Sequence, residues 1–194
     1  MKFGWTSTNA FIVKFLISLL IIGVIIGFYI YYDKTDLVKE SISHELSYLG
    51  NILQTTQQNN FINHIIIFSV GMFLSLIIIG LPLILFYYFY EGVSLGFLLA
   101  SLFDYNGMEG LFFGLIFTII NKLILYVALI YLLLFSFHYA KRMIVSIRRK
   151  DFKIYEFVSN QIFRNIFVMI IILISNAFIF FLGNRILAYF LFLL

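Results

Sequence analysis

The sequence predicts an all-α protein, a polytopic membrane bundle of about five spans with a short or broken pair of helices in its middle. Of the 194 residues, 63% are hydrophobic and 11% are charged, whereas a soluble domain has roughly 45–50% apolar and about 25% charged residues. The mean hydropathy of +1.05 leaves too little polar surface to cover a globule in water. The chain is short for two domains, so residues 1–194 are predicted to form a single transmembrane domain.

The first apolar run, Phe15 to Tyr32, contains 18 residues without a charge. As a helix it covers roughly 27 Å, close to the thickness of a hydrocarbon core, about 30 Å. No small-residue cleavage site follows, and the run ends in the aromatic collar Tyr29–Tyr32. Because aromatic collars lie at membrane interfaces, we expect a retained span and not a cleaved signal peptide.

Residues 33–60 form the only long polar stretch. Apolar residues recur there every three or four positions, which predicts an amphipathic helix from Asp36, its N-cap, to Gly50, its C-cap. The tract 54–60 (QTTQQNN) is interpreted as a linker back to the membrane. Residues 33–60 are therefore expected to be an extracytoplasmic amphipathic helix followed by a linker.

The middle of the chain predicts an irregular helix pair. A second span is expected from Ile65 to Phe86, with a kink at Pro82 near its end. Residues 92–103 are too few for an untilted crossing, and they end in the acidic turn 104–109. Residues 110–139 are too many for one straight crossing, and polar residues interrupt them near the middle. This pattern is typical of a broken or re-entrant helix.

Residues 140–164 hold seven basic residues against two acidic ones. By the positive-inside rule this basic loop is cytoplasmic. A last span, Ile166 to Leu182, then leads to a hydrophobic tail. Five crossings are therefore expected, with the N-terminus in the cytoplasm and the C-terminus outside, in a multi-pass membrane protein.

Glycine spacing is the clearest local signal. The apolar segments contain three GxxxG pairs, where about 0.7 would arise by chance; the pairs are Gly23/Gly27, Gly92/Gly96 and Gly110/Gly114. Small residues at this spacing let helix backbones approach closely inside lipid. Two interpretations stay open, namely packing inside one bundle and an interface with a partner or a second copy of the chain.

Three polar residues are candidates for a buried polar site or a helix break: Glu91, Asn121 and Lys122. Glu91 is expected at the inner membrane edge, either as a snorkelling charge or as a buried carboxylate paired with Lys122. Asn121 is expected to satisfy backbone groups freed by a helix break, and Lys122 to face the bundle interior or to snorkel. A polar site or conduit is the functional alternative.

No catalytic or metal-binding motif is present. The histidines His44, His64 and His138 are far apart, and the sequence contains no HExxH, GxSxG, P-loop or GxGxxG pattern. No cysteine is available for a disulfide or a thiolate metal site. We therefore expect a chain that is not an enzyme, with no cofactor, no metal and no nucleic-acid partner, and with the lipid bilayer as its surroundings.

The stretch from Tyr90 to Arg142 resembles the stage II sporulation protein M family of small bacterial polytopic membrane proteins. The matching features are the opening Gly92, Gly96 and Phe97, a turn with Gly107 and Gly110, and Asn121 at the position of the family's asparagine. Ile119, Ile120 and Lys122 depart from the family's pattern, as does Asn176, which stands where a glutamate is common. The resemblance covers about 100 residues and rests on glycine spacing and hydropathy.

The resemblance implies a five-span membrane scaffold without enzymatic activity, which recruits or anchors peptidoglycan-remodelling partners such as cell-wall hydrolases. In spore-forming bacteria this role belongs to engulfment, and in other bacteria it would be a general envelope role. A membrane transporter or permease component, with a polar site at the broken helix, is the alternative.

Overall fold

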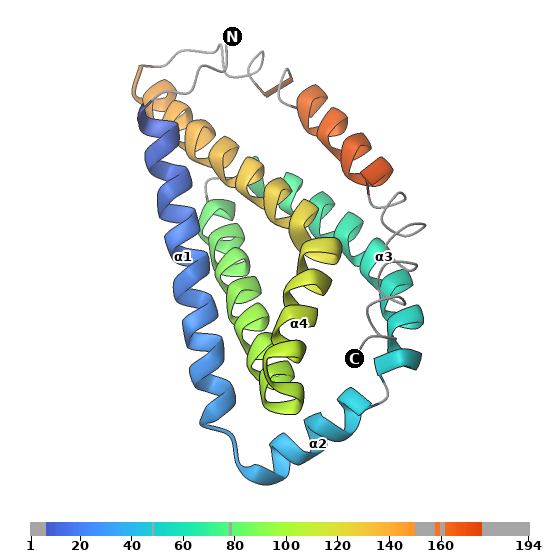
Figure 1. Ribbon diagram of the computed structural model, residues 1–194. Coiled ribbons are helices and arrows are strands. Elements are labelled where there is room, and N and C mark those ends of the chain that lie inside the picture. The colour runs from blue at the N-terminus through green and yellow to red at the C-terminus, as the bar shows by residue number, and fades with distance from the viewer. Residues whose placement is uncertain (1–6, 48, 78, 150–157, 160–161, 176–194) are drawn as a thin grey trace.

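The computed structural model describes residues 7–47, 49–77, 79–149, 158–159 and 162–175 (Figure 1). Four helices follow one another along the chain: α1 (Ser7–Tyr32), α2 (Asp36–Ser47), α3 (Leu49–Ser75) and α4 (Gly80–Arg149). A further apolar helix covers Ile162–Ser175. The described residues contain no strand, so the predicted all-α class is confirmed.

The long helix α4 is a helical hairpin. Non-helical backbone angles occur inside it at Asn106 (φ −138°, ψ 25°) and at Gly107 (φ 58°, ψ −137°). A positive φ strains residues that carry a Cβ atom, and glycine at this position avoids the strain. The first arm (residues 80–105) and the second arm (residues 108–149) therefore run back along each other, as the green and yellow parts of Figure 1 show.

The expected short helix in the middle of the chain is wrong. The first arm begins at Gly80, so it is a full-length helix of about 39 Å. The predicted span Ile65–Phe86 is instead interrupted, because α3 ends at Ser75 and the Gly80 N–H donates to the Ile77 carbonyl in a turn (2.9 Å). Pro82 lies in the first turn of α4, where its missing N–H costs no hydrogen bond, and it does not kink a span.

The expected break at Asn121 is also wrong. The second arm continues through this residue, whose side-chain Nδ2 donates to the Phe117 carbonyl one turn earlier (3.0 Å). A hydrogen bond of this kind satisfies a buried amide locally without opening the helix. The ribbon nevertheless changes direction in its yellow stretch, so the second arm crosses the molecule obliquely (Figure 1).

Three predicted loop or boundary assignments need correction. The tract 54–60 is helical and belongs to α3, so it is not a linker. The amphipathic helix ends at Ser47, before the predicted C-cap at Gly50. Helix α4 extends to Arg149, so the first part of the predicted basic loop 140–164 is helical. The last predicted span is helical from Ile166 to Ser175, and its remainder lies outside the described residues, as does Asn176.

The core lies where α1 and the two arms of α4 meet. One cluster of buried residues joins them, with Leu16 from α1, Ile84 and Tyr88 from the first arm, and Leu125, Leu129 and Leu133 from the second. A second cluster, made of Phe68, Ala128, Leu132 and Ile172, joins α3, the second arm and the Ile162–Ser175 helix. Helix α1 thus packs along the hairpin, and α3 covers the upper part of the second arm (Figure 1).

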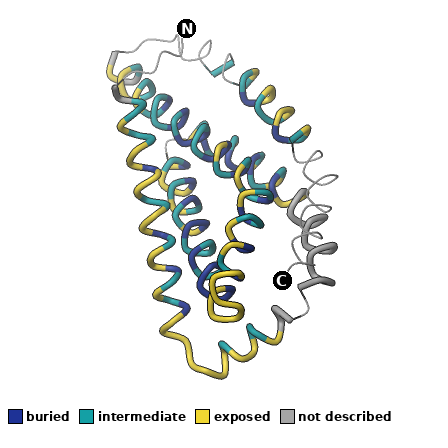
Figure 2. Tube along the Cα trace, in the orientation of Figure 1, coloured by how far each residue is buried: buried dark blue, intermediate teal, exposed yellow. Residues whose placement is uncertain are grey.

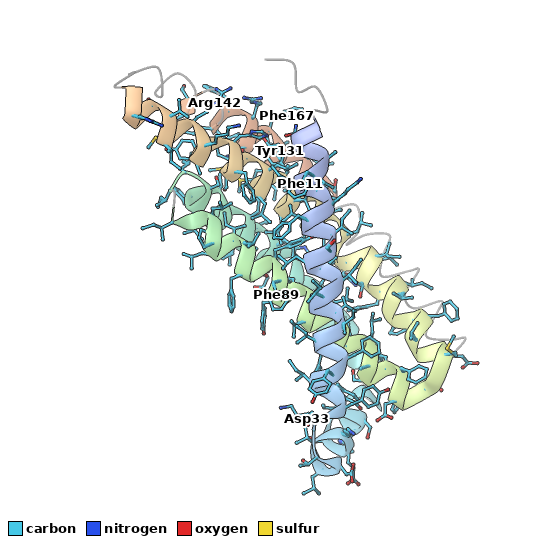
Figure 3. All side chains as sticks on the ribbon, turned by 90° about the vertical axis from the view of Figure 1, so that its left-hand side faces the viewer. Phe11, Asp33, Phe89, Tyr131, Arg142 and Phe167 are labelled. Carbon is cyan, nitrogen blue, oxygen red and sulfur yellow. The ribbon has the colours of Figure 1, made fainter. Side chains whose placement is uncertain are left out.

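Opposite charges gather at the two ends of this bundle. Asp33, at the end of α1, lies at the bottom of Figure 3, and Arg142 lies at the top. At the acidic end, the Tyr31 hydroxyl donates to Asp104 of the hairpin (2.9 Å). At the basic end, His138 Nε2 lies 2.8 Å from Asn9 Oδ1, a hydrogen bond between the second arm and the start of α1. These contacts align α1 with the hairpin at both ends.

The outer surface of the bundle is apolar. In α1 the residues that are buried form a single stripe, and Phe11, Ile25 and Tyr29 are each more than 60% exposed. Figure 2 shows α1 largely as exposed or intermediate. Two helical stretches, Asn9–Tyr32 and Gly80–Ser146, are long and apolar enough to cross a membrane, and the mean hydropathies of their 18-residue apolar windows are 2.8 and 2.2.

Candidate functional site

Glu91 and Lys122 form an ion pair between the two arms of α4. Lys122 Nζ lies 2.7 Å from Glu91 Oε2. The Tyr87 hydroxyl, one turn before Glu91 on the same arm, donates to the other carboxylate oxygen, Oε1 (2.6 Å). Each oxygen of the carboxylate therefore accepts a hydrogen bond, and the ammonium group balances its charge.

Glu91 does not lie at the end of a helix, where the sequence placed it. The neighbouring Gly92 packs against Leu20 and Gly23, which lie near the middle of α1. The reason is that α4 begins at Gly80, so the first arm is already well advanced when it reaches Glu91. The ion pair therefore lies halfway between the acidic and basic ends of the bundle.

Burial makes the two partners depend on each other. The Glu91 side chain is 9% exposed and the Lys122 side chain is 25% exposed. Removing a charge from water costs several kcal/mol per ion, and only a close partner of opposite charge offsets that cost. The pair is thus a cross-link between the arms, and neither residue can be removed alone without leaving an uncompensated charge.

Polar residues continue along the second arm on either side of the pair. Thr118 and Tyr126 lie one helical turn before and after Lys122. Their hydroxyl groups are buried, and among the described residues neither has a hydrogen-bond partner. Asn121 is buried, and its side chain donates a hydrogen bond to the backbone of its own helix. Among the described residues it makes no hydrogen bond with Glu91 or Lys122.

Tyr87 and Tyr126 were not among the candidates taken from the sequence. The available signal was their spacing, since Tyr87 lies four residues before Glu91 and Tyr126 four residues after Lys122. Residues at this spacing share a helix face. Tyr87 follows directly after the predicted end of a span at Phe86, because hydropathy does not mark the helix boundary at Gly80.

Two glycine pairs bring α1 against the first arm of α4. A Cβ atom at Gly23 would lie 2.8 Å from the Phe89 carbonyl oxygen and 3.1 Å from Gly92 Cα. A Cβ atom at Gly27 would meet the Val93 carbonyl and would lie 3.0 Å from Gly96 Cα. Gly23 thus faces Gly92 and Gly27 faces Gly96. The two helix backbones therefore approach more closely than larger side chains would allow.

The third glycine pair closes the hairpin itself. A Cβ atom at Gly110 would meet the Leu102 carbonyl, and one at Gly114 would lie 2.9 Å from Leu99 Cδ2. All three pairs therefore make contacts inside the chain, which is the first of the two interpretations left open by the sequence. Each of these six glycines thus has atoms of the same chain close to the position that a Cβ atom would take.

The described residues hold no group of three His, Asp or Glu side chains that could bind a metal ion. No family model matches the chain, and comparisons with curated proteins and with solved structures find no match. The resemblance to the stage II sporulation protein M family is therefore carried by the quoted residues alone.

Proposed function

We propose that this chain is an integral membrane protein of about five spans that acts as a scaffold, by binding partners and not by chemistry. The observation that carries the proposal is the ion pair at mid-bundle, where Lys122 and Tyr87 occupy both oxygens of Glu91. Because the charges of Glu91 and Lys122 balance each other inside the chain, the pair can hold the two arms of α4 together without a bound substrate.

The apolar surface supports the membrane part of this proposal. Only 17% of the most apolar window of α1 is buried in the protein, although its mean hydropathy is 2.8. A soluble protein would cover such a helix, because exposed apolar surface in water is unfavourable. Lipid covers it without cost, and charges at both ends then lie in the two aqueous phases.

The order of the helices supports five crossings with the N-terminus in the cytoplasm. Helix α1 runs from the basic end to the acidic end, α3 returns, and the two arms of α4 go out and back (Figure 1). The Ile162–Ser175 helix then begins the last crossing. In this orientation Lys141 and Arg142 would lie on the cytoplasmic side, where the positive-inside rule expects basic residues.

The tip of the α4 hairpin, residues 103–109, is the surface that partners would contact. It exposes acidic and apolar side chains together, a mixture that suits a protein partner. The exposed residues are Phe103, Asp104, Tyr105, Met108 and Glu109. From the family resemblance, we propose that the partners are peptidoglycan-remodelling enzymes such as cell-wall hydrolases.

Co-purification of the tagged chain from native membranes tests the scaffold. We expect a cell-wall hydrolase to be recovered with the parent chain, and much less of it with the Tyr105→Ser/Met108→Ser variant, which changes only exposed side chains of the tip. A Phe86→Ser variant is the control, because Phe86 is also an exposed apolar residue of the first arm but lies far from the tip. Recovery of the parent chain without any wall enzyme would argue against this function.

A transporter component is the second candidate. The hydroxyls of Thr118 and Tyr126 near Lys122 favour it, because they find no hydrogen-bond partner in the described part of the chain and such groups can line a path for a polar solute. Uptake or conductance in proteoliposomes, lost in Lys122→Leu and retained in Lys14→Leu, would support the transporter over the scaffold.

A further inference from the structure

The last turns of α4 carry basic and apolar side chains on one exposed face. Lys141, Ile144, Val145 and Arg148 follow one another at spacings of three, one and three, so they lie on a single side of the helix. All four are exposed, and Ile144 is 60% exposed. We call these four residues the basic-apolar face.

Its position places this face where a membrane surface would be. His138 contacts Asn9 at the start of α1, so residues 141–148 extend beyond the basic end of the bundle. Arg142 marks this end at the top of Figure 3. Helix α4 crosses obliquely here, as the orange part of Figure 1 shows, and it does not continue straight along α1.

The chemistry of the face identifies its partner. Lys141 and Arg148 have no hydrogen bond or ion pair with the residues that the structure describes, so their donors are available. Isoleucine and valine between two cations match the boundary where acyl chains meet charged headgroups. Nucleic acid would gain nothing from the two exposed aliphatic side chains between the charges.

We propose that the basic-apolar face binds anionic phospholipid headgroups of the cytoplasmic leaflet, with Ile144 and Val145 inserted at the acyl boundary. This inference rests on the proposed membrane function and adds a lipid specificity to it. The pair Lys141 and Arg148 would each contact a phosphate, and the second arm would thereby be held at a fixed tilt.

A tryptophan reporter tests the proposal in the full-length chain. Trp5 is the only tryptophan, so a Trp5→Phe background allows a single reporter at Ile144→Trp. The protein is reconstituted into phosphatidylcholine vesicles in which the same fraction of the lipid is brominated, either as phosphatidylglycerol or as phosphatidylcholine. We expect strong quenching by brominated phosphatidylglycerol and weak quenching by brominated phosphatidylcholine.

Removing the charges provides the matched variant. In Lys141→Gln and Arg148→Gln, the affinity of the reporter segment for phosphatidylglycerol should fall about fivefold for each charge removed. Added salt should weaken the quenching in the parent chain, because it screens the attraction. Equal quenching in both kinds of vesicle, or quenching that ignores these substitutions, would overturn the proposal.

A second reporter separates this failure from failure of the membrane assignment. Ile25 lies in α1 and is 62% exposed, so Ile25→Trp should be quenched in both kinds of vesicle. Quenching at Ile25 without a phosphatidylglycerol effect at Ile144 would reject the lipid specificity alone. Absence of quenching at Ile25 would reject the proposed function and this inference with it.

Discussion

Replacing Lys122 by methionine should destabilise the protein more than replacing both members of the ion pair. Methionine has a similar volume but leaves Glu91 buried with a single hydrogen bond, from Tyr87. Removing one partner of a buried pair costs about 3–5 kcal/mol. Lys122 is a quarter exposed and Tyr87 remains, so we expect a loss of about 2–3 kcal/mol in the free energy of unfolding.

The double variant Glu91→Gln/Lys122→Met should recover most of that loss. Glutamine carries no charge and can still accept the hydrogen bond from Tyr87, so no uncompensated ion remains. We expect the double variant to lie within about 1 kcal/mol of the parent chain. The coupling free energy between the two positions should therefore be about 2 kcal/mol.

Reversible unfolding in mixed micelles of a mild detergent and dodecyl sulfate, followed by circular dichroism of the helices, measures these free energies. Lys14→Met is the matched control, because Lys14 lies on an exposed face of α1, and it should leave the unfolding midpoint unchanged. A Lys122→Met variant as stable as the parent chain would refute the reasoning. A double variant as unstable as the sum of its single variants would also refute it.

Two further predictions concern the glycines, measured by the same unfolding titration. Gly96→Ala should lower the free energy of unfolding by about 1–3 kcal/mol, because the added Cβ atom meets the backbone of Val24. Gly71→Ala should lower it clearly less, because its Cβ atom meets only the flexible end of the Leu132 side chain. Equal losses in the two variants would contradict the close backbone contact at Gly96. Gly107→Ala should cost about 1–3 kcal/mol through the positive φ alone, since no atom lies within 4 Å of the added Cβ; an unchanged stability would contradict the hairpin geometry.

Patterns that depend on neighbouring residues along the chain could be predicted well. The helical class follows from composition and apolar runs. The four-residue spacing of the glycines indicates close helix packing, but it does not show that Gly23 and Gly27 pack on Gly92 and Gly96. The pairing of Glu91 with Lys122 was one of two alternatives, because a charge deep in an apolar segment needs a partner. What selects the partner is the hairpin, which the turn at Asn106 and Gly107 creates.

Helix boundaries inside apolar sequence could not be predicted from hydropathy. The chain turns between Ser75 and Gly80, and the intervening residues are as apolar as the helices on either side. The signals that mark the boundary are Gly80, whose added Cβ would meet the Leu74 carbonyl, and Pro82 in the first turn that follows. Because hydropathy does not mark this boundary, the helix that contains Glu91 was expected to be short, whereas it begins at Gly80.

The buried amide at position 121 was misinterpreted for a different reason. A polar residue in the middle of an apolar run indicates either a helix break or a side chain that bonds to its own helix. The hydrogen bond from Asn121 to the Phe117 carbonyl shows the second case. A helix break and a side chain bonded to its own helix show the same pattern in the sequence, so only the backbone conformation distinguishes the two cases.

Cysteine labelling tests the membrane crossing and its direction most directly, because the native chain contains no cysteine. Single cysteines are introduced at Glu109, at the tip of the α4 hairpin, and at Arg148, at the basic end of the bundle, since both side chains are exposed. In intact cells, a membrane-impermeant maleimide should label the Glu109→Cys chain at once and the Arg148→Cys chain only after permeabilisation. Labelling of both from the same side of the membrane, or in the reverse order, would contradict the account.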